Sequence, residues 1–228
     1  MISSTVERVN KAWDRIDAWY AKNAPDWTLS AGATDEEIDI LAKNLNVTLP
    51  EEFRVSLKRH NGIDEGIWPN NWLMPIESIQ ATWETVTELA KNDHVKSHKV
   101  NTDEIYQQKY WCERWVPVDA NGTSSGGLIM DLSPGPKGRI GQLIHFNHKK
   151  GPIRLTYPDY ASYLEDMADQ LEKGKYVVED DYLEINDEDG ADEGKDKDEE
   201  GEEGEEDGEE QDGDEEEEKS HSKKKVKI

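Results

Sequence analysis

The fold is decided by a segment that reads Trp115-Val116-Pro117-Val118-Asp119, then Leu128-Ile129-Met130-Asp131-Leu132, then Gly141-Gln142-Leu143-Ile144-His145-Phe146. Each stretch is short and mostly apolar, and residues typical of turns separate them, so the segment predicts three strands. Ile153, Leu155 and Tyr157 alternate with other residues and predict a fourth strand. The segment carries no nucleophile motif, phosphate-binding loop or metal cluster. The segment therefore offers no recognisable catalytic signature.

Helical patterns precede this segment. Apolar residues spaced three and four apart predict a first helix over residues 3–21, with a buried stripe formed by Val6, Val9, Trp13, Ile16 and Tyr20. Thr34 followed by Glu37 has the form of a capping box and predicts the start of a second helix. Pro50 suits the first position of a third helix, where a missing N–H costs nothing, and Asn61-Gly62 suits its end.

A fourth helical stripe runs from Ile76 to Leu89, and the clearest helical face of the chain lies within residues 158–172. We expect residues 63–75 to form a loop that leads into a short strand, and residues 91–110 to form a polar excursion. Helices first, strands together in the middle and a helix last favour the α+β class over an alternating βαβ fold. The expected architecture is an antiparallel sheet flanked by N-terminal helices and a C-terminal helix.

Charge divides the 228-residue chain into two parts. Of its 52 acidic residues, 26 lie from Glu179 onward, together with 7 of its 27 Lys and Arg residues. All eight Trp and both Phe residues lie before that point, so we expect one folded domain over residues 1–178. Residues 179–228 cannot bury enough apolar surface to offset the entropy of ordering them, so we expect a disordered acidic tail.

Several features exclude whole classes of protein. A single cysteine, Cys112, rules out an internal disulfide framework and fits a reducing compartment. The N-terminus lacks the apolar core of a signal peptide, and no apolar run approaches ~18 residues, so we expect a soluble cytoplasmic protein without a membrane span. The lysine-rich stretch at residues 223–227 resembles a nuclear import signal, which adds the nucleus as an alternative location.

Net charge indicates the kind of partner. A formal net charge of −25 disfavours direct binding to nucleic acid, because phosphate contacts need clustered Lys and Arg. The same charge favours a protein partner with a basic surface, chiefly by speeding association. The acidic tail is either an arm that binds basic proteins or a solubilising segment with no dedicated partner.

Asp119 and Asp131 are the candidate catalytic pair, since acid–base catalysis uses carboxyl groups held close together. No further catalytic group accompanies them at a recognisable spacing, so we favour the alternative in which both end strands and accept hydrogen bonds from turn amides. Four of the six histidines occur as two pairs, His94 with His98 and His145 with His148. A zinc site needs three or four ligands, so we expect no metal site. We also expect no cofactor and no catalytic residue.

Trp68 and Trp72 flank Pro69-Asn70-Asn71 in the stretch that we expect to be a loop. Large aromatic side chains on a loop can anchor an interface, although a tryptophan is more often buried in its own domain. Both alternatives stay open. The candidate partner-binding residues are Trp68, Trp72, Asp119, Asp131 and Gln142.

Two motifs resemble those of a known family. Leu49-Pro50-Glu51-Glu52-Phe53, followed by His60-Asn61-Gly62, is similar to the first motif of the SUKH superfamily, which includes the fungal Smi/Knr-type regulators of cell-wall synthesis. The second motif is Trp115-x-Pro117-x-Asp119 with Asp131-Leu132-x-Pro134-Gly135-Pro136-x-Gly138-x-x-Gly141-Gln142. Residues 158–172 resemble the closing helix of that family. The resemblance covers about residues 10–176, nearly the whole expected domain.

The resemblance implies a single SUKH-like domain that acts as a non-catalytic protein-interaction module. In fungi such proteins are linked to control of β-1,3-glucan synthesis and cell-integrity signalling, so the first hypothesis is a regulatory protein of this type. In bacteria and some viruses similar domains are immunity proteins that neutralise toxins, often nucleases, and this is the alternative. A further alternative places the function in the acidic tail, as a chaperone-like binder of basic proteins.

Overall fold

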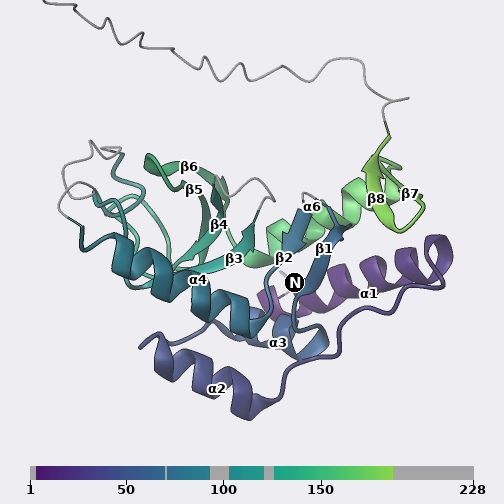
Figure 1. Cartoon of the computed structure of the whole chain (residues 1–228), viewed down its shortest axis with the longest axis horizontal. Coiled ribbons are helices and arrows are strands. Elements are labelled where there is room, and N and C mark those ends of the chain that lie inside the picture. The colour runs from purple at the N-terminus through teal and green to yellow at the C-terminus, as the bar shows by residue number, and fades with distance from the viewer. Residues whose placement is uncertain (1–3, 70, 93–102, 121–125, 187–228) are drawn as a thin grey trace, which may run out of the picture. The chain divides into compact units, whose positions relative to one another are not determined.

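The computed structural model describes residues 4–69, 71–92, 103–120 and 126–186 (Figure 1). Its helices are α1 (Thr5–Asn23), α2 (Asp35–Asn44), α3 (Glu51–Arg59), α4 (Ile76–Leu89) and α6 (Tyr160–Glu172). Its strands are β1 (Ile63–Trp68), β2 (Asn71–Leu73), β3 (Trp115–Ala120), β4 (Gly126–Asp131), β5 (Gln142–Asn147), β6 (Gly151–Tyr157), β7 (Tyr176–Glu179) and β8 (Tyr182–Ile185). The predicted α+β class is confirmed.

Local sequence accounts for where the first helices begin. The Ser4 hydroxyl accepts a hydrogen bond from the Glu7 amide (3.2 Å) and so caps α1. At α2 the predicted capping box is present, because Thr34 and Glu37 each satisfy the other's backbone amide. Pro50 stands one position earlier than predicted, as the N-cap residue of α3, with Glu51 as its first helical residue.

The strands β1 to β6 form one sheet in which each strand pairs antiparallel with the next along the chain. Val116 and Val118 of β3 belong to the large core shared with α1 and α6, whereas Trp115 belongs to a second core. That second core also holds Val86 of α4 and aromatic side chains from residues 105–112. Figure 1 shows the sheet between α4 on one side and α6 on the other. The sheet is therefore buried on both faces along much of its length.

The expectation that residues 63–75 form a loop leading into a short strand is right for the short strand, β2, and wrong for the loop before it. Residues in this stretch form the β1–β2 hairpin, and β2 pairs with β3 through Leu73 and Asp119. A register shift in β1 separates Ile63 from Trp68, which are both buried although five residues apart. This irregularity removes the simple alternation by which a strand is recognised in a sequence, and the pairing that makes it a strand comes from a distant segment.

The described structure continues past the expected domain boundary. Residue 178 lies within β7, and β7 pairs with β8 up to Ile185. Gly174 ends α6 in a left-handed conformation (φ +75°), which redirects the chain into this hairpin. Tyr176 is buried in the main core, so the hairpin is held by its first residue. The strand β8 holds the apolar residues Tyr182, Leu183 and Ile185, but the acidic residues on either side of it hide this pattern in the sequence.

Two arginines of α1 hold α6 alongside it. The Arg8 guanidinium donates to Asp159 (3.2 Å) and Glu165 (2.5 Å) at the start and in the first half of α6. Arg15 donates to Asp169 (2.6 Å) and to Glu172 (2.5 Å) at its end. Because the pairs lie along both helices, they set the register of α1 against α6.

A buried serine joins three helices. The Trp13 indole Nε1 donates to the Ser56 hydroxyl oxygen (2.9 Å), which lies 2.9 Å from the Tyr160 hydroxyl. All three side chains are almost fully buried. Ser56 therefore satisfies polar groups of α1 and α6 that have no access to water.

Ser56→Ala is expected to lower the free energy of unfolding by about 1–3 kcal/mol, because it removes the partner of two buried polar groups. Ser78→Ala serves as the control, since that hydroxyl in α4 makes no hydrogen bond to the described residues; its effect should stay within ~0.5 kcal/mol. Urea unfolding followed by circular dichroism measures both. Equal stabilities for the two variants would contradict the role assigned to Ser56.

Candidate functional site

Asp131 and Gln142 lie at the centre of a buried hydrogen-bond cluster. One carboxylate oxygen of Asp131 accepts hydrogen bonds from the Trp115 indole and the Ser133 amide, both at 2.9 Å. The other accepts from the Gln142 amide at 3.0 Å. The predicted hydrogen bond from a turn amide to Asp131 is thus confirmed, and burial raises the pKa of this carboxyl although the three donors lower it. This cluster closes the turn between β4 and β5.

The same turn holds the segment that precedes β3. Gln142 donates to the Ile105 carbonyl oxygen (3.0 Å), and the Gly135 amide donates to the same oxygen (3.0 Å). A Cβ atom on Gly138 would lie 1.9 Å from this oxygen, so no side chain fits there. The second family-like motif therefore builds a cradle for backbone of its own chain.

Asp119 and Trp68 lie at two ends of another buried chain of hydrogen bonds. The Trp68 indole donates to the Tyr163 hydroxyl (2.8 Å), which donates to an Asp119 carboxylate oxygen (2.7 Å). A register shift between Pro117 and Asp119 turns the Asp119 side chain toward α6. Burial raises the pKa of Asp119 to about 7, and the hydrogen bond from Tyr163 partly opposes this. The chain links β1, α6 and β3.

The structure separates the five candidate partner-binding residues by environment. Trp68, Asp119, Asp131 and Gln142 are each at most 5 % exposed. Trp72 is half-buried on β2 and lines a small apolar cavity of about 140 Å³ together with Pro117 and Phe146. Partner contact by these residues stays a prediction, and the burial of all but Trp72 argues against direct contact.

The first family-like motif also has structural roles. The two ring nitrogens of His60 lie 2.7 Å from the Ser30 carbonyl oxygen and 2.9 Å from an Asp17 carboxylate oxygen. Asn61 accepts a hydrogen bond from the Ile76 amide (2.9 Å) and so caps α4. Gly62 has a φ of +76°, and a Cβ atom there would lie 2.5 Å from the Pro75 nitrogen. These contacts fix how α3 leads into the sheet.

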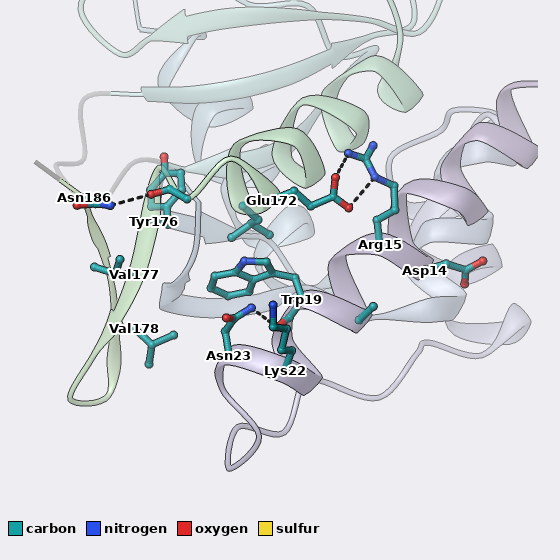
Figure 2. Close-up of a pocket in the computed structure, with 13 residues that line it drawn as sticks. Asp14, Arg15, Trp19, Lys22, Asn23, Glu172, Tyr176, Val177, Val178 and Asn186 are labelled. Carbon is teal, nitrogen blue, oxygen red and sulfur yellow. Dashed lines mark hydrogen bonds and ion pairs between the residues drawn. The ribbon is translucent and has the colours of Figure 1, made fainter. Parts of the chain in front are cut away.

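An open groove lies between α1 and the C-terminal hairpin (Figure 2). One face of α1 forms a wall of this groove, through Asp14, Arg15, Ala18, Trp19, Lys22 and Asn23. These positions repeat at intervals of four residues, which places them on one side of a helix. The groove has a volume of about 760 Å³ and is open to solvent.

The hairpin forms the opposite wall of the groove. Tyr176, Val177 and Val178 of β7 line it, and Leu171 at the end of α6 lies between the two walls. Figure 2 shows the Trp19 ring projecting from α1 toward the strand that carries Val177. Trp19 is half-buried against the main core, so its ring provides both packing and an apolar surface within the groove.

Charged groups surround this apolar floor. Arg15 is held by Glu172 and Asp169, and its hydrogen bonds hold the pKa of each of these exposed carboxyls below its usual range. Lys22 lies farther along the same helix face and forms no ion pair with a described residue. No pair of groups arranged for acid–base catalysis is seen among the described groove residues. The arrangement is suited to holding a polypeptide segment.

Sequence reasoning missed this groove. Trp19 falls outside the apolar stripe predicted for the first helix, and such an off-stripe tryptophan is a signal of an exposed aromatic group. The alternation in Tyr182-Leu183-Glu184-Ile185 signals a strand, but it stands within an acidic composition. That Trp19 and β7 lie on opposite sides of a groove follows only from the packing of α1 against α6.

The described residues include neither a cluster of metal ligands nor a helix long and apolar enough to cross a membrane. His145 and His148 are half-buried, while His94 and His98 lie outside the described ranges. Within those ranges no group of three or more His, Cys, Asp or Glu side chains converges as metal ligands would. Every helix in the same ranges is too short or too polar to cross a lipid bilayer.

Asp119→Asn is expected to change how stability depends on pH. The folded-state pKa of Asp119, about 7, lies above the unfolded value near 3.9. The contribution of Asp119 to the free energy of unfolding is therefore complete below pH ~4 and is lost as pH rises through ~7. The amide keeps an acceptor for Tyr163 and does not ionise. The variant should therefore gain stability over the natural chain between pH 4 and 8, by up to about 4 kcal/mol. Urea unfolding across this range measures the difference; a difference independent of pH would contradict the assignment.

Comparison with known proteins places the chain in a family. A model of the SMI1 / KNR4 family (SUKH-1) matches residues 32–166. The "Cell wall biosynthesis/cell cycle regulator smi1" of Schizosaccharomyces pombe is 29% identical over 192 residues, which cover 76% of this chain and 38% of that protein. The "Glucan synthesis regulatory protein" of Neurospora crassa is 26% identical over 218 residues, covering 78% and 41%. The "Cell wall assembly regulator SMI1" of Saccharomyces cerevisiae is 26% identical over 211 residues, covering 75% and 42%.

The chain thus spans about two-fifths of the length of these relatives. The match to the family model includes both motifs singled out in the sequence, from Leu49 to Gln142, and most of the described helices and strands. It also covers more than half of the chain. The protein belongs to the SMI1 / KNR4 family (SUKH-1).

Proposed function

We propose that this protein regulates cell-wall glucan synthesis and does so by binding other proteins. Relatives from three fungi are named as regulators of the cell wall or of glucan synthesis, and this shared description supports the cell-wall role. The observation that carries the binding role is the open groove beside α1, which combines an apolar floor with charged walls.

A non-catalytic role is part of the proposal. Asp119 and Asp131, the carboxyl groups that could have formed a catalytic pair, are at most 5 % exposed and have buried hydrogen-bond partners within the domain. The hydrogen bonds of Asp131 close the turn between β4 and β5, and the hydrogen bond of Asp119 joins β3 to α6. A group that donates or takes a proton in catalysis must reach a substrate. Asp131 is fully buried, and Asp119 borders a small apolar cavity of about 140 Å³ and accepts a hydrogen bond from Tyr163.

The partner that fits this protein has a basic surface. The formal net charge of the chain is −25, and this charge attracts Lys- and Arg-rich proteins while it disfavours direct contact with nucleic acid. The immunity-protein alternative requires a basic partner too, but the named fungal relatives support the regulatory role. The alternative that places the function in the acidic segment concerns residues outside the described ranges.

Expression of this chain in Saccharomyces cerevisiae that lacks its SMI1 protein is expected to restore part of cell-wall β-1,3-glucan. The readouts are glucan content and growth in the presence of a dye that binds cell walls. The matched region of the yeast protein, expressed alone, is the control because this chain corresponds to only 42% of that protein.

The proposal predicts that this chain and the yeast region restore growth to a similar degree. If the yeast region restores glucan and this chain, at equal abundance, does not, the cell-wall role is contradicted. Ser78→Ala, which changes a half-buried hydroxyl of α4 with no hydrogen bond to the described residues, should behave as the unaltered chain.

A further inference from the structure

We propose that the groove beside α1 binds an extended, basic segment of a partner protein, which pairs with β7 as a third strand of the C-terminal hairpin. This inference rests on the proposed protein-binding function and adds to it a surface and the chemistry of the segment bound there. It is carried by the edge of β7, by the shape of the groove and by the charge around it.

The groove runs along an edge of β7. Tyr176, Val177 and Val178 all line it, although side chains of consecutive residues in a strand point to opposite faces. A groove that contacts three consecutive residues must therefore follow the backbone of the strand. Among the described strands β7 pairs with β8 alone, so its other edge has no neighbouring strand.

The hydrogen-bond pattern of the hairpin shows which backbone groups face this edge. The Asn186 amide donates to the Lys175 carbonyl oxygen (2.8 Å), so these two residues form a hydrogen-bonded pair. Such pairs alternate with non-hydrogen-bonded pairs along an antiparallel ladder. The pair of Val178 with Leu183 is three steps along and is therefore of the second kind. The amide and carbonyl of Val178 consequently point away from β8, toward the groove.

The groove suits an extended chain. A strand that pairs with β7 lies about 4.8 Å from it and presents side chains alternately to the two faces of the sheet. One set of these side chains would reach the apolar floor made by Ala18, Trp19 and Leu171. Strand addition gives affinity through backbone hydrogen bonds and selectivity through such alternate side chains. An apolar residue at every second position is therefore expected in the segment that binds.

The charge around the groove selects basic residues at the remaining positions. The hairpin carries Glu179, Asp180, Asp181 and Glu184, none of which forms an ion pair with another described residue. Lys or Arg side chains on the solvent side of the bound strand would meet these hairpin carboxylates, whereas Lys22 stands on the opposite wall of the groove.

The direct test uses a synthetic octapeptide of alternating lysine and valine, with both ends blocked, added to the full ¹⁵N-labelled chain. Binding is followed by amide and indole chemical shifts. The largest changes are expected at Val177, Val178 and the Trp19 indole. A second peptide of the same sequence, N-methylated on the residues that would pair with β7, is the matched control because it keeps the charge and side chains but cannot form the strand ladder.

Two variants locate the contact on the protein. Val178→Pro removes an amide that points toward the groove, not toward β8, and proline is tolerated at such an edge position. Trp19→Ala removes the apolar floor. Each should weaken binding of the unmodified peptide about tenfold or more, which corresponds to ~1.4 kcal/mol. Spectra in which the resonances of Trp13 and Trp115 are unchanged would confirm that both variants keep the core.

Three results would overturn the proposal. Equal affinity for the plain and N-methylated peptides would mean that only charge attraction, chiefly to residues 187–228, is at work. Unchanged shifts at Val177 and Val178 would place binding elsewhere. The third result concerns the chain without peptide, in which Lys223, Lys225 and Lys227 are replaced by Glu. Changes in the chemical shifts of Val177 and Val178 in this variant would show that the chain's own basic stretch occupies the groove. None of these results bears on growth of the complemented yeast, so failure here leaves the proposed function to its own test.

Discussion

The structure depends on the buried hydrogen-bond chain that runs from Trp68 through Tyr163 to Asp119. A carboxyl group in this environment is costly to ionise, and the Tyr163 hydroxyl offsets part of that cost only when α6 lies in one position over the sheet. The Trp68 indole, on the edge strand β1, donates a hydrogen bond to the same Tyr163 hydroxyl. One tyrosine thus couples a central strand, an edge strand and the last helix of the domain.

The position of α6 in turn creates the groove. Arg8 and Arg15 bind carboxylates along α6 and hold α1 beside it, and Gly174 turns the chain at its end. The chain then returns as β7 across from the same face of α1 that carries Trp19. The free edge of β7 is therefore presented at a fixed separation from a helix face, without a loop having to order on binding. A preformed surface of this kind reduces the entropy that a partner must lose.

The residues that reveal the family are distinct from those that offer a binding surface. His60, Asn61 and Gly62 close the passage from α3 to the sheet, while Asp131 and Gln142 close the β4–β5 turn. Hydrogen bonds and close backbone contacts within the domain require these residue types. The residues therefore resemble functional motifs in the sequence, although their contacts stabilise the fold. A polar residue between apolar strands does not by itself indicate whether its partner is a ligand or the chain.

The sequence alone determined the elements whose causes are local: the capping box at Thr34, the stripe of α1, the helix over residues 160–172 and the strands β3 to β6. Apolar spacing and capping act within a few residues, so they can be read directly. Only the tertiary structure decided that Trp68 is buried, that residues 182–185 form a strand between acidic segments, and that β7 and Trp19 share a groove. Each of these depends on contacts between residues far apart in the chain, which no local pattern encodes.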